Sequence, residues 1–259
     1  MLSKVGRYRF AAEPFHCDFA GGMFLSHAAN CMLNAAEFHS DERGYGMHAL
    51  NAEGCTWVLS RLVVEMSAMP PAYSSVDIDT WVEGVMRFFT SRDFAVSSVD
   101  GQVYGYGRSI WAMIDSHTRQ PVEIVSVDNG LIAEYVDSER ACPIKPFARV
   151  KISPAAVVAA EITAGYSDVD VNGHVNSAKY IEHILDLWGM ERYAVDRIAR
   201  LDIAYLNEAL CGDKLSFRVE RQGERTFCVG VMRSRKGESD VEACRARIVF
   251  APKEQQPQP

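Results

Sequence analysis

The sequence predicts an α+β protein made of two tandem repeats, in each of which an antiparallel sheet wraps around one long helix. Each half of the 259-residue chain contains a stretch of helical periodicity, preceded by one strand-like segment and followed by several more. The halves keep the same order of elements, and their last strands align without gaps. A twisted sheet around a buried helix covers the apolar faces of both, which is the hotdog arrangement. The predicted fold is therefore a double hotdog.

In the first half, a strand is expected at 6–15 and a helix at 26–39. Four alternating segments rich in Val, Ile, Thr and aromatic residues then predict strands at 56–65, 75–85, 87–96 and 103–114. The second half repeats this order with a strand at 156–165 and a helix at 175–188. Its remaining strands are predicted at 198–206, 213–221, 226–233 and 241–250.

Few periodic runs and several prolines mark the middle of the chain, which favours a connection between the repeats. The final residues are polar and Pro-rich, with nothing to pack. The predicted organisation is a first hotdog, a linker, a second hotdog and a disordered tail, at 1–130, 131–155, 156–252 and 253–259.

The composition excludes several functional classes. A formal net charge of −7 without a run of Lys or Arg argues against nucleic acid or an anionic membrane as the main partner. No apolar run approaches the roughly 18 residues that span a bilayer, and no signal peptide precedes the first strand, so we expect a cytoplasmic protein without a membrane span. The seven cysteines are scattered and never spaced C-x-x-C, and no histidine has metal-ligand spacing, so we expect free thiols, no metal site and no cofactor.

The strongest chemical signal lies directly before the second-half helix. Asp170, Asn172 and His174 alternate, so an extended or turning backbone would project all three to one side. The helix start adds unpaired N–H groups and partial positive charge, which suit an oxygen that gains negative charge during attack on a carbonyl. The segment predicts an active-site loop.

With these residues in view, the chain resembles the acyl-acyl-carrier-protein (acyl-ACP) thioesterases, and their bacterial branch most closely. The resemblance runs from about Tyr8 to Phe250. It is carried by Trp57-Val-Leu-Ser-Arg-Leu, Asp79-Thr-Trp-Val-Glu, Arg108-Ser-Ile-Trp-Ala-Met-Ile-Asp and, above all, Ser167-Asp-Val-Asp-Val-Asn-Gly-His-Val-Asn-Ser-Ala-Lys-Tyr-Ile-Glu.

The resemblance implies a catalytic network formed by Asp170, Asn172, His174 and Glu208. Plant members commonly have Cys directly after the Glu, but this chain has Ala209, so a nucleophilic thiol is missing from its expected place. Cys211, two residues further on, would keep the same strand face and is only a weak substitute.

Thioester hydrolysis needs a base, an oxyanion donor and a group that holds the water. Asp170 or Glu208 could be the base, and the sequence leaves this choice open. Asn172 and His174 could orient the water or the carbonyl, while backbone N–H groups near Gly173 and Val175 could receive the oxyanion. Asn176 is expected to cap the helix or to position substrate. Taken singly, these residue types also fit turns, caps or structural hydrogen bonds.

The first half lacks a D-x-N-x-H motif, so it is expected to shape the acyl pocket. Candidate wall residues are the apolar side chains Trp57, Trp81, Met86, Phe88 and Trp111, although each also fits an ordinary core position. The resemblance implies hydrolysis of fatty acyl-ACP in fatty acid biosynthesis, with acyl carrier protein as partner and a homodimer as an open alternative. The rival functions are an acyl-CoA thioesterase on the same fold and a non-catalytic acyl-ligand sensor.

Overall fold

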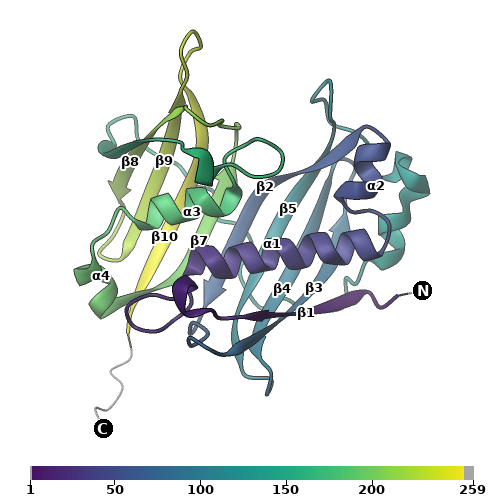
Figure 1. Ribbon diagram of the computed structural model, residues 1–259, viewed down its shortest axis with the longest axis horizontal. Helices are drawn as coiled ribbons and strands as arrows, with labels where there is room; N and C mark the ends of the chain where they lie inside the picture. Colours follow the sequence, from purple (N-terminus) through teal and green to yellow (C-terminus); the bar gives the residue numbers. More distant parts are fainter. Residues whose placement is uncertain (1, 254–259) are drawn as a thin grey trace. The chain divides into compact units, whose positions relative to one another are not determined.

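The computed structural model describes residues 2–253, and the rest of the predicted tail lies outside the described residues. The chain divides into two compact units, Met1–Phe147 and Ala148–Pro259 (Figure 1). Each unit holds a five-stranded antiparallel arrangement and helices on it, which confirms the predicted repeats and the double hotdog class. Among the described residues, no helix combines the length and apolar character needed to cross a membrane.

In the first unit, the strands follow the order β1-β3-β4-β5-β2 across the sheet. Their bounds are β1 Val5–Ala11, β2 Cys55–Met66, β3 Ser75–Val85, β4 Phe89–Ser98 and β5 Val103–Asp115. β1 ends four residues before its predicted end because Pro14 cannot continue a strand and instead begins a 3-10 helix, η1 (Pro14–His16).

The long helix α1 (Leu25–Glu42) lies against this sheet (Figure 1). Its buried face consists mostly of small and flexible apolar residues, which allow close approach to the strands: Ala28, Ala29, Met32, Ala35 and Ala36. The helix stops where Gly44 adopts a positive φ of 82°, a conformation that favours glycine at a helix C-terminus. The short helix α2 (Met47–Ala52) follows.

Residues 131–147, which the sequence assigned to a linker, pack against the first unit. Ile132 and Tyr135, in η3 (Asp128–Tyr135) after the short η2 (Ile124–Ser126), are buried in one apolar cluster with Val82 of β3. The N–H of Asp137 donates to the carbonyl of Val82 at 2.8 Å. The segment stays with this unit because its apolar side chains are covered there, a long-range contact that prolines and weak periodicity did not reveal.

The second unit repeats the plan with the strand order β7-β10-β9-β8-β6. Its strands are β6 Val157–Thr163, β7 Asp196–Tyr205, β8 Lys214–Arg221, β9 Thr226–Ser234 and β10 Val241–Pro252. The helices are η4 (Tyr166–Asp168), α3 (Ser177–Leu185) and α4 (Met190–Val195). α3 buries Tyr180, Ile181 and Ile184 and ends before its predicted limit, because Trp188 turns onto Phe227 and Phe250 with ring centroids 5.2 and 5.3 Å away.

Candidate active site

The segment predicted as an active-site loop forms a tight hairpin between η4 and α3. Val169 and Val175 pair across it, and the N–H of Asp170 donates to the carbonyl of His174 at 2.9 Å. Asp170 and His174 are therefore opposite each other on the two arms. The turn closes with a 3.0 Å bond from the N–H of Gly173 to the carbonyl of Asp170, and Gly173 has φ +80°, which explains glycine there.

The Asp170 carboxylate also stabilises this turn. Its Oδ1 accepts a 2.8 Å hydrogen bond from the N–H of Asn172. Asn172 lies exposed at the tip, and its side-chain amide makes no hydrogen bond with the residues that the structure describes. The alternation, which fitted an extended or a turning backbone, is realised as a turn, with Asp170 and His174 on the arms and Asn172 between them.

His174 and Glu208, which are far apart in the sequence, lie close together in the structure. His174 Nε2 lies 3.2 Å from Glu208 Oε2, and the two side chains are 30% and 40% exposed. Both groups can therefore meet a water molecule or a substrate. The carboxylate implied by the resemblance and the histidine of the motif are indeed brought together.

Two backbone contacts hold the hairpin in place. The N–H of Val175 donates to the carbonyl of Ala209, the neighbour of Glu208, at 2.8 Å. The N–H of Asn176 donates to the carbonyl of Asp168, also at 2.8 Å, and Asn176 Oδ1 caps α3 by accepting from the N–H of Ala178. The capping role expected for Asn176 is confirmed.

These contacts correct one expectation. Backbone N–H groups near Gly173 and Val175 were candidates to receive the oxyanion, but those of Gly173 and Val175 themselves each donate to a carbonyl within the second unit. A turn of this kind uses its own donors, because buried backbone groups need partners. The exposed amide of Asn172 is a better placed donor than either.

The Asp168 side chain makes contacts on both sides of the hairpin's start. Its Oδ2 accepts from the N–H of Gly165 at 2.7 Å, and its Oδ1 lies 2.9 Å from His183 Nε2 on α3. Burial favours the neutral acid, but the hydrogen bonds from Gly165 and His183 outweigh it and hold the pKa of Asp168 below its usual value. The contact between Asp168 and His183 therefore fixes the start of the hairpin against α3.

The region around Glu208 is anchored on both sides. The hydroxyl of Tyr205, at the end of β7, donates to the carbonyl of Ser177 at 2.9 Å. Asn207 Nδ2 donates to the carbonyl of Glu242, and Asp213 Oδ2 accepts from the N–H of Leu210. Ala209 is fully buried, and Cys211 is exposed.

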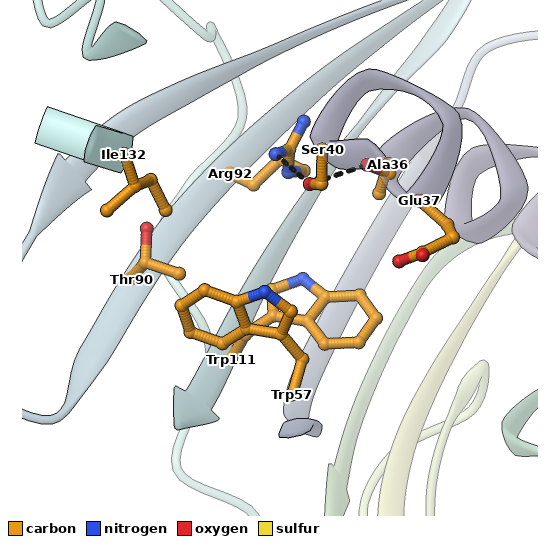
Figure 2. A pocket seen from close by; sticks show the side chains of 8 residues that line it. All are labelled: Ala36, Glu37, Ser40, Trp57, Thr90, Arg92, Trp111 and Ile132. Carbon is orange, nitrogen blue, oxygen red and sulfur yellow. Dashed lines mark hydrogen bonds between the residues drawn. The ribbon is translucent and has the colours of Figure 1, made fainter. Parts of the chain in front are cut away.

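A pocket that is partly open to solvent lies within the first unit (Figure 2). Trp57 and Trp111, both predicted as acyl-binding residues, line it. Its other lining residues are Ala36, Glu37, Ser40, Thr90, Arg92 and Ile132. The sequence did not suggest the polar ones. The position of Arg92 within an alternating strand was the available signal.

The other three apolar candidates lie elsewhere. Thr80 accepts from Arg92, which also donates to Ser40 of α1, so Thr80 faces the helix and the next residue, Trp81, faces away from it. Trp81 is covered instead by Arg140, whose guanidinium lies 4.6 Å from the ring centroid. Met86, between β3 and β4, is 53% exposed, and Phe88 in the same turn lies under Arg87. None of the three lines this pocket.

A further set of potential ligands lies in the first unit, where no metal spacing was expected. The ligand atoms of Glu13, His16 and His27 all lie within 4.8 Å of one another. Spacing in the sequence does not predict this cluster, because His27 comes close to Glu13 and His16 only through the packing of α1 beside η1.

Comparison with known proteins completes the description. The sequence profile of the acyl-ACP thioesterase N-terminal domain matches residues 4–135, and that of the C-terminal domain matches residues 153–252. A palmitoyl-acyl carrier protein thioesterase of Gossypium hirsutum is 29% identical over 160 residues, which are 60% of this chain and 38% of that protein. An acyl-[acyl-carrier-protein] hydrolase of Cuphea viscosissima is 24% identical over 191 residues, 70% of this chain and 46% of that protein. The chain thus spans less than half the length of these curated relatives.

Two solved structures align with almost the whole chain. An acyl-ACP thioesterase from Bacteroides thetaiotaomicron is 44% identical, covers 96% of this chain and 98% of its own, and superposes with a TM-score of 0.87. A 12:0-ACP thioesterase from Umbellularia californica, 21% identical, shares the fold with a TM-score of 0.84 and covers 98% of this chain and 99% of its own. Since the two domain profiles together match most of the sequence, this chain belongs to the acyl-ACP thioesterase family.

Proposed function

We propose that this protein hydrolyses the thioester of fatty acyl-ACP and releases a free fatty acid and the carrier protein. The observation that carries the proposal is the pair formed by His174 Nε2 and Glu208 Oε2 at 3.2 Å, beside the hairpin of Asp170 and Asn172. Membership of the acyl-ACP thioesterase family supports the same chemistry.

In this mechanism Glu208 is the base. The carboxylate is partly exposed and can accept a proton from a water molecule, while His174 holds the carboxylate and the water in line. Asp170 is less suited to this role, because one of its oxygens already accepts from the turn. Its task is to keep Asn172 and His174 in their relative positions.

The reaction then proceeds by direct attack of water. The water oxygen forms a bond to the thioester carbon as its proton passes to Glu208, and the amide of Asn172 donates to the oxygen that becomes negative. Collapse of the tetrahedral intermediate breaks the carbon–sulfur bond, and the proton returns from Glu208 to the departing thiolate. No thiol nucleophile is needed, which fits Ala209 at the position after Glu208.

We assign the acyl chain to the first half of the molecule. The predicted role of residues 1–130 in shaping the acyl pocket is supported by the indoles of Trp57 and Trp111 along a pocket of that unit. Each buried methylene contributes about 0.8 kcal/mol, so a change in the size of this wall alters chain-length preference strongly. Trp111→Ala should shift the preferred length, whereas Trp81→Phe, on the opposite face of the sheet, should leave it unchanged.

The decisive experiment compares carriers. The purified protein is assayed for thiol release with one series of acyl groups, each attached to acyl carrier protein and to coenzyme A. The proposal expects a higher kcat/KM on every carrier-protein thioester, and loss of activity in Glu208→Gln. A preference for coenzyme A would identify the rival thioesterase, and tight acyl binding without hydrolysis would identify a sensor.

A further inference from the structure

The cluster of Glu13, His16 and His27 lies at the junction of η1 and α1, within the first unit. Glu13 precedes η1, His16 ends it, and His27 is in the first turn of α1. Glu13 Oε2 lies 3.3 Å from His16 Nδ1 and 3.5 Å from His27 Nε2. A single carboxylate oxygen therefore faces one ring nitrogen from each histidine.

These separations are compatible with metal ligands. Both exceed the range of about 2.7–3.2 Å that hydrogen bonds between nitrogen and oxygen usually occupy. Ligands bound tetrahedrally to Zn²⁺ at about 2.0–2.2 Å are about 3.3–3.5 Å apart, whereas neighbouring ligands of an octahedral ion at the same bond length are only about 3 Å apart. The distances from Glu13 to the two histidines fall in the tetrahedral range, and the two histidine nitrogens lie within 4.8 Å of each other.

The backbone fixes the positions of these residues. The N–H of His16 donates to the carbonyl of Glu13 at 2.8 Å, and the N–H of Phe24 donates to the carbonyl of His16 at 2.9 Å. The two imidazoles stack with centroids 4.0 Å apart and planes inclined by 12°, so one ring must rotate about its side-chain bonds before both nitrogens point at one ion. The Glu13 and His16 side chains are about half exposed and His27 is 17% exposed, so an ion can enter from solvent.

We propose that Glu13, His16 and His27 bind one divalent transition-metal ion, with Zn²⁺ as the best fit, in a site separate from the catalytic pair. Two imidazoles and one carboxylate form a donor set typical of zinc, and the fourth position stays open to water. Cys31 Sγ lies 3.6 Å from His27 Nε2 but is buried behind it, outside the three-residue group. The bound ion links the segment before α1 to the helix.

The test is a titration of the full chain, first freed of metal by a chelator, with Zn²⁺ by calorimetry. We expect one ion per chain, an increase in melting temperature of roughly 5 °C at a hundredfold excess over Kd, and no effect of Mg²⁺. Glu13→Gln and His16→Ala should each weaken binding at least about tenfold. Both positions are half exposed, so circular dichroism should show a folded protein in each case.

Two control variants distinguish Zn²⁺ binding at this site from Zn²⁺ binding at other histidines. His117→Ala, in an exposed turn, and His174→Ala, in the catalytic pair, should bind Zn²⁺ like the original chain. Co²⁺ should give the intense visible absorption of a tetrahedral complex, and His16→Ala should lose it. The proposal is overturned if the chain binds no Zn²⁺, if Glu13→Gln and His16→Ala bind normally, or if only His174→Ala loses the ion.

Discussion

The two halves of this protein contain the same hairpin before their long helices, but only one carries polar side chains suited to catalysis. In the first half, Cys17 pairs with Met23, the N–H of Asp18 donates to the carbonyl of Gly22 at 2.7 Å, and Gly21 has φ +77°. The second hairpin, from Val169 to Val175, has the same pairing, the same closing bond and a glycine at φ +80°. The turn itself is therefore structural.

Three differences between the halves concern the polar residues of the second hairpin and its neighbour Glu208. Ala20 takes the place of Asn172, and Gly22 that of His174. The N–H of Met23 donates to the carbonyl of Pro70, as that of Val175 donates to Ala209, so Met69 corresponds to Glu208. A Cβ added at Gly22 would lie only 3.2 Å from the Cβ of Met69. Apolar packing thus fills the position that the polar pair occupies in the second half.

The comparison teaches that Asp alone does not mark an active site. Asp18 accepts from the N–H groups of Ala20 and Gly22 at 2.9 and 3.0 Å, much as Asp170 accepts from Asn172. Both aspartates stabilise their turns by the same geometry. What distinguishes the second hairpin is the histidine opposite Asp170 and the glutamate that faces it.

The largest expected effect comes from the paired substitutions Asp170→Asn and Asp18→Asn. Asparagine keeps an oxygen for either turn but loses the carboxylate charge, and only in the second hairpin does that charge lie opposite a histidine of the proposed catalytic pair, His174. We expect Asp170→Asn to lower kcat at least about a hundredfold and Asp18→Asn to leave it unchanged. Steady-state thioester hydrolysis measures both. Equal activity of the two folded variants would show that the second hairpin is only structural.

A smaller effect is expected for Asp168→Asn, at the position that His16 occupies in the first half. Because the folded-state pKa of Asp168 lies below its usual value, its charge stabilises the fold above about pH 4, and this contribution disappears as the pH falls through the folded-state pKa. At pH 7 we expect a loss of about 1–3 kcal/mol in the free energy of unfolding. Urea unfolding at pH 7 and pH 3 should show the difference shrinking in acid. A loss that did not depend on pH would contradict this explanation.

The glycines of the two turns provide the next test. Gly173→Ala and Gly21→Ala each place a side chain at positive φ with open space around it, so each should destabilise the protein by about 1–2 kcal/mol. Melting curves should give similar losses. Turnover below the melting range should fall only for Gly173→Ala, and a fall for both would remove the distinction between the hairpins.

The smallest effect is expected for Cys211→Ser. Cys211 is exposed, and direct attack by water needs no thiol, so activity and stability should change little, within about 0.5 kcal/mol for stability. Rapid quench and mass measurement offer the sharper test. An acyl group trapped on Cys211 would replace the water mechanism by covalent catalysis.

Local patterns were sufficient to predict most of the secondary structure. Strand β3 occupies the predicted residues 75–85, and α1 includes the predicted 26–39. Alternation and helical spacing are properties of residues close together in the chain, so a single sequence is enough to recognise them. The ends of β1 and α3 differ because Pro14 and the packing of Trp188 decide them.

For the site, the sequence by itself determined which residue types precede α3 and, through the family resemblance, that Glu208 belongs with them. Their catalytic roles stay a prediction. Only the tertiary structure decided that the N–H groups of Gly173 and Val175 are already used, since the second of them pairs with a carbonyl 34 residues away. It also placed Trp81 on the sheet face opposite α1 and gathered Glu13, His16 and His27. Hydrogen-bond partners and strand faces depend on which distant segments pack together, and local sequence patterns do not record that choice.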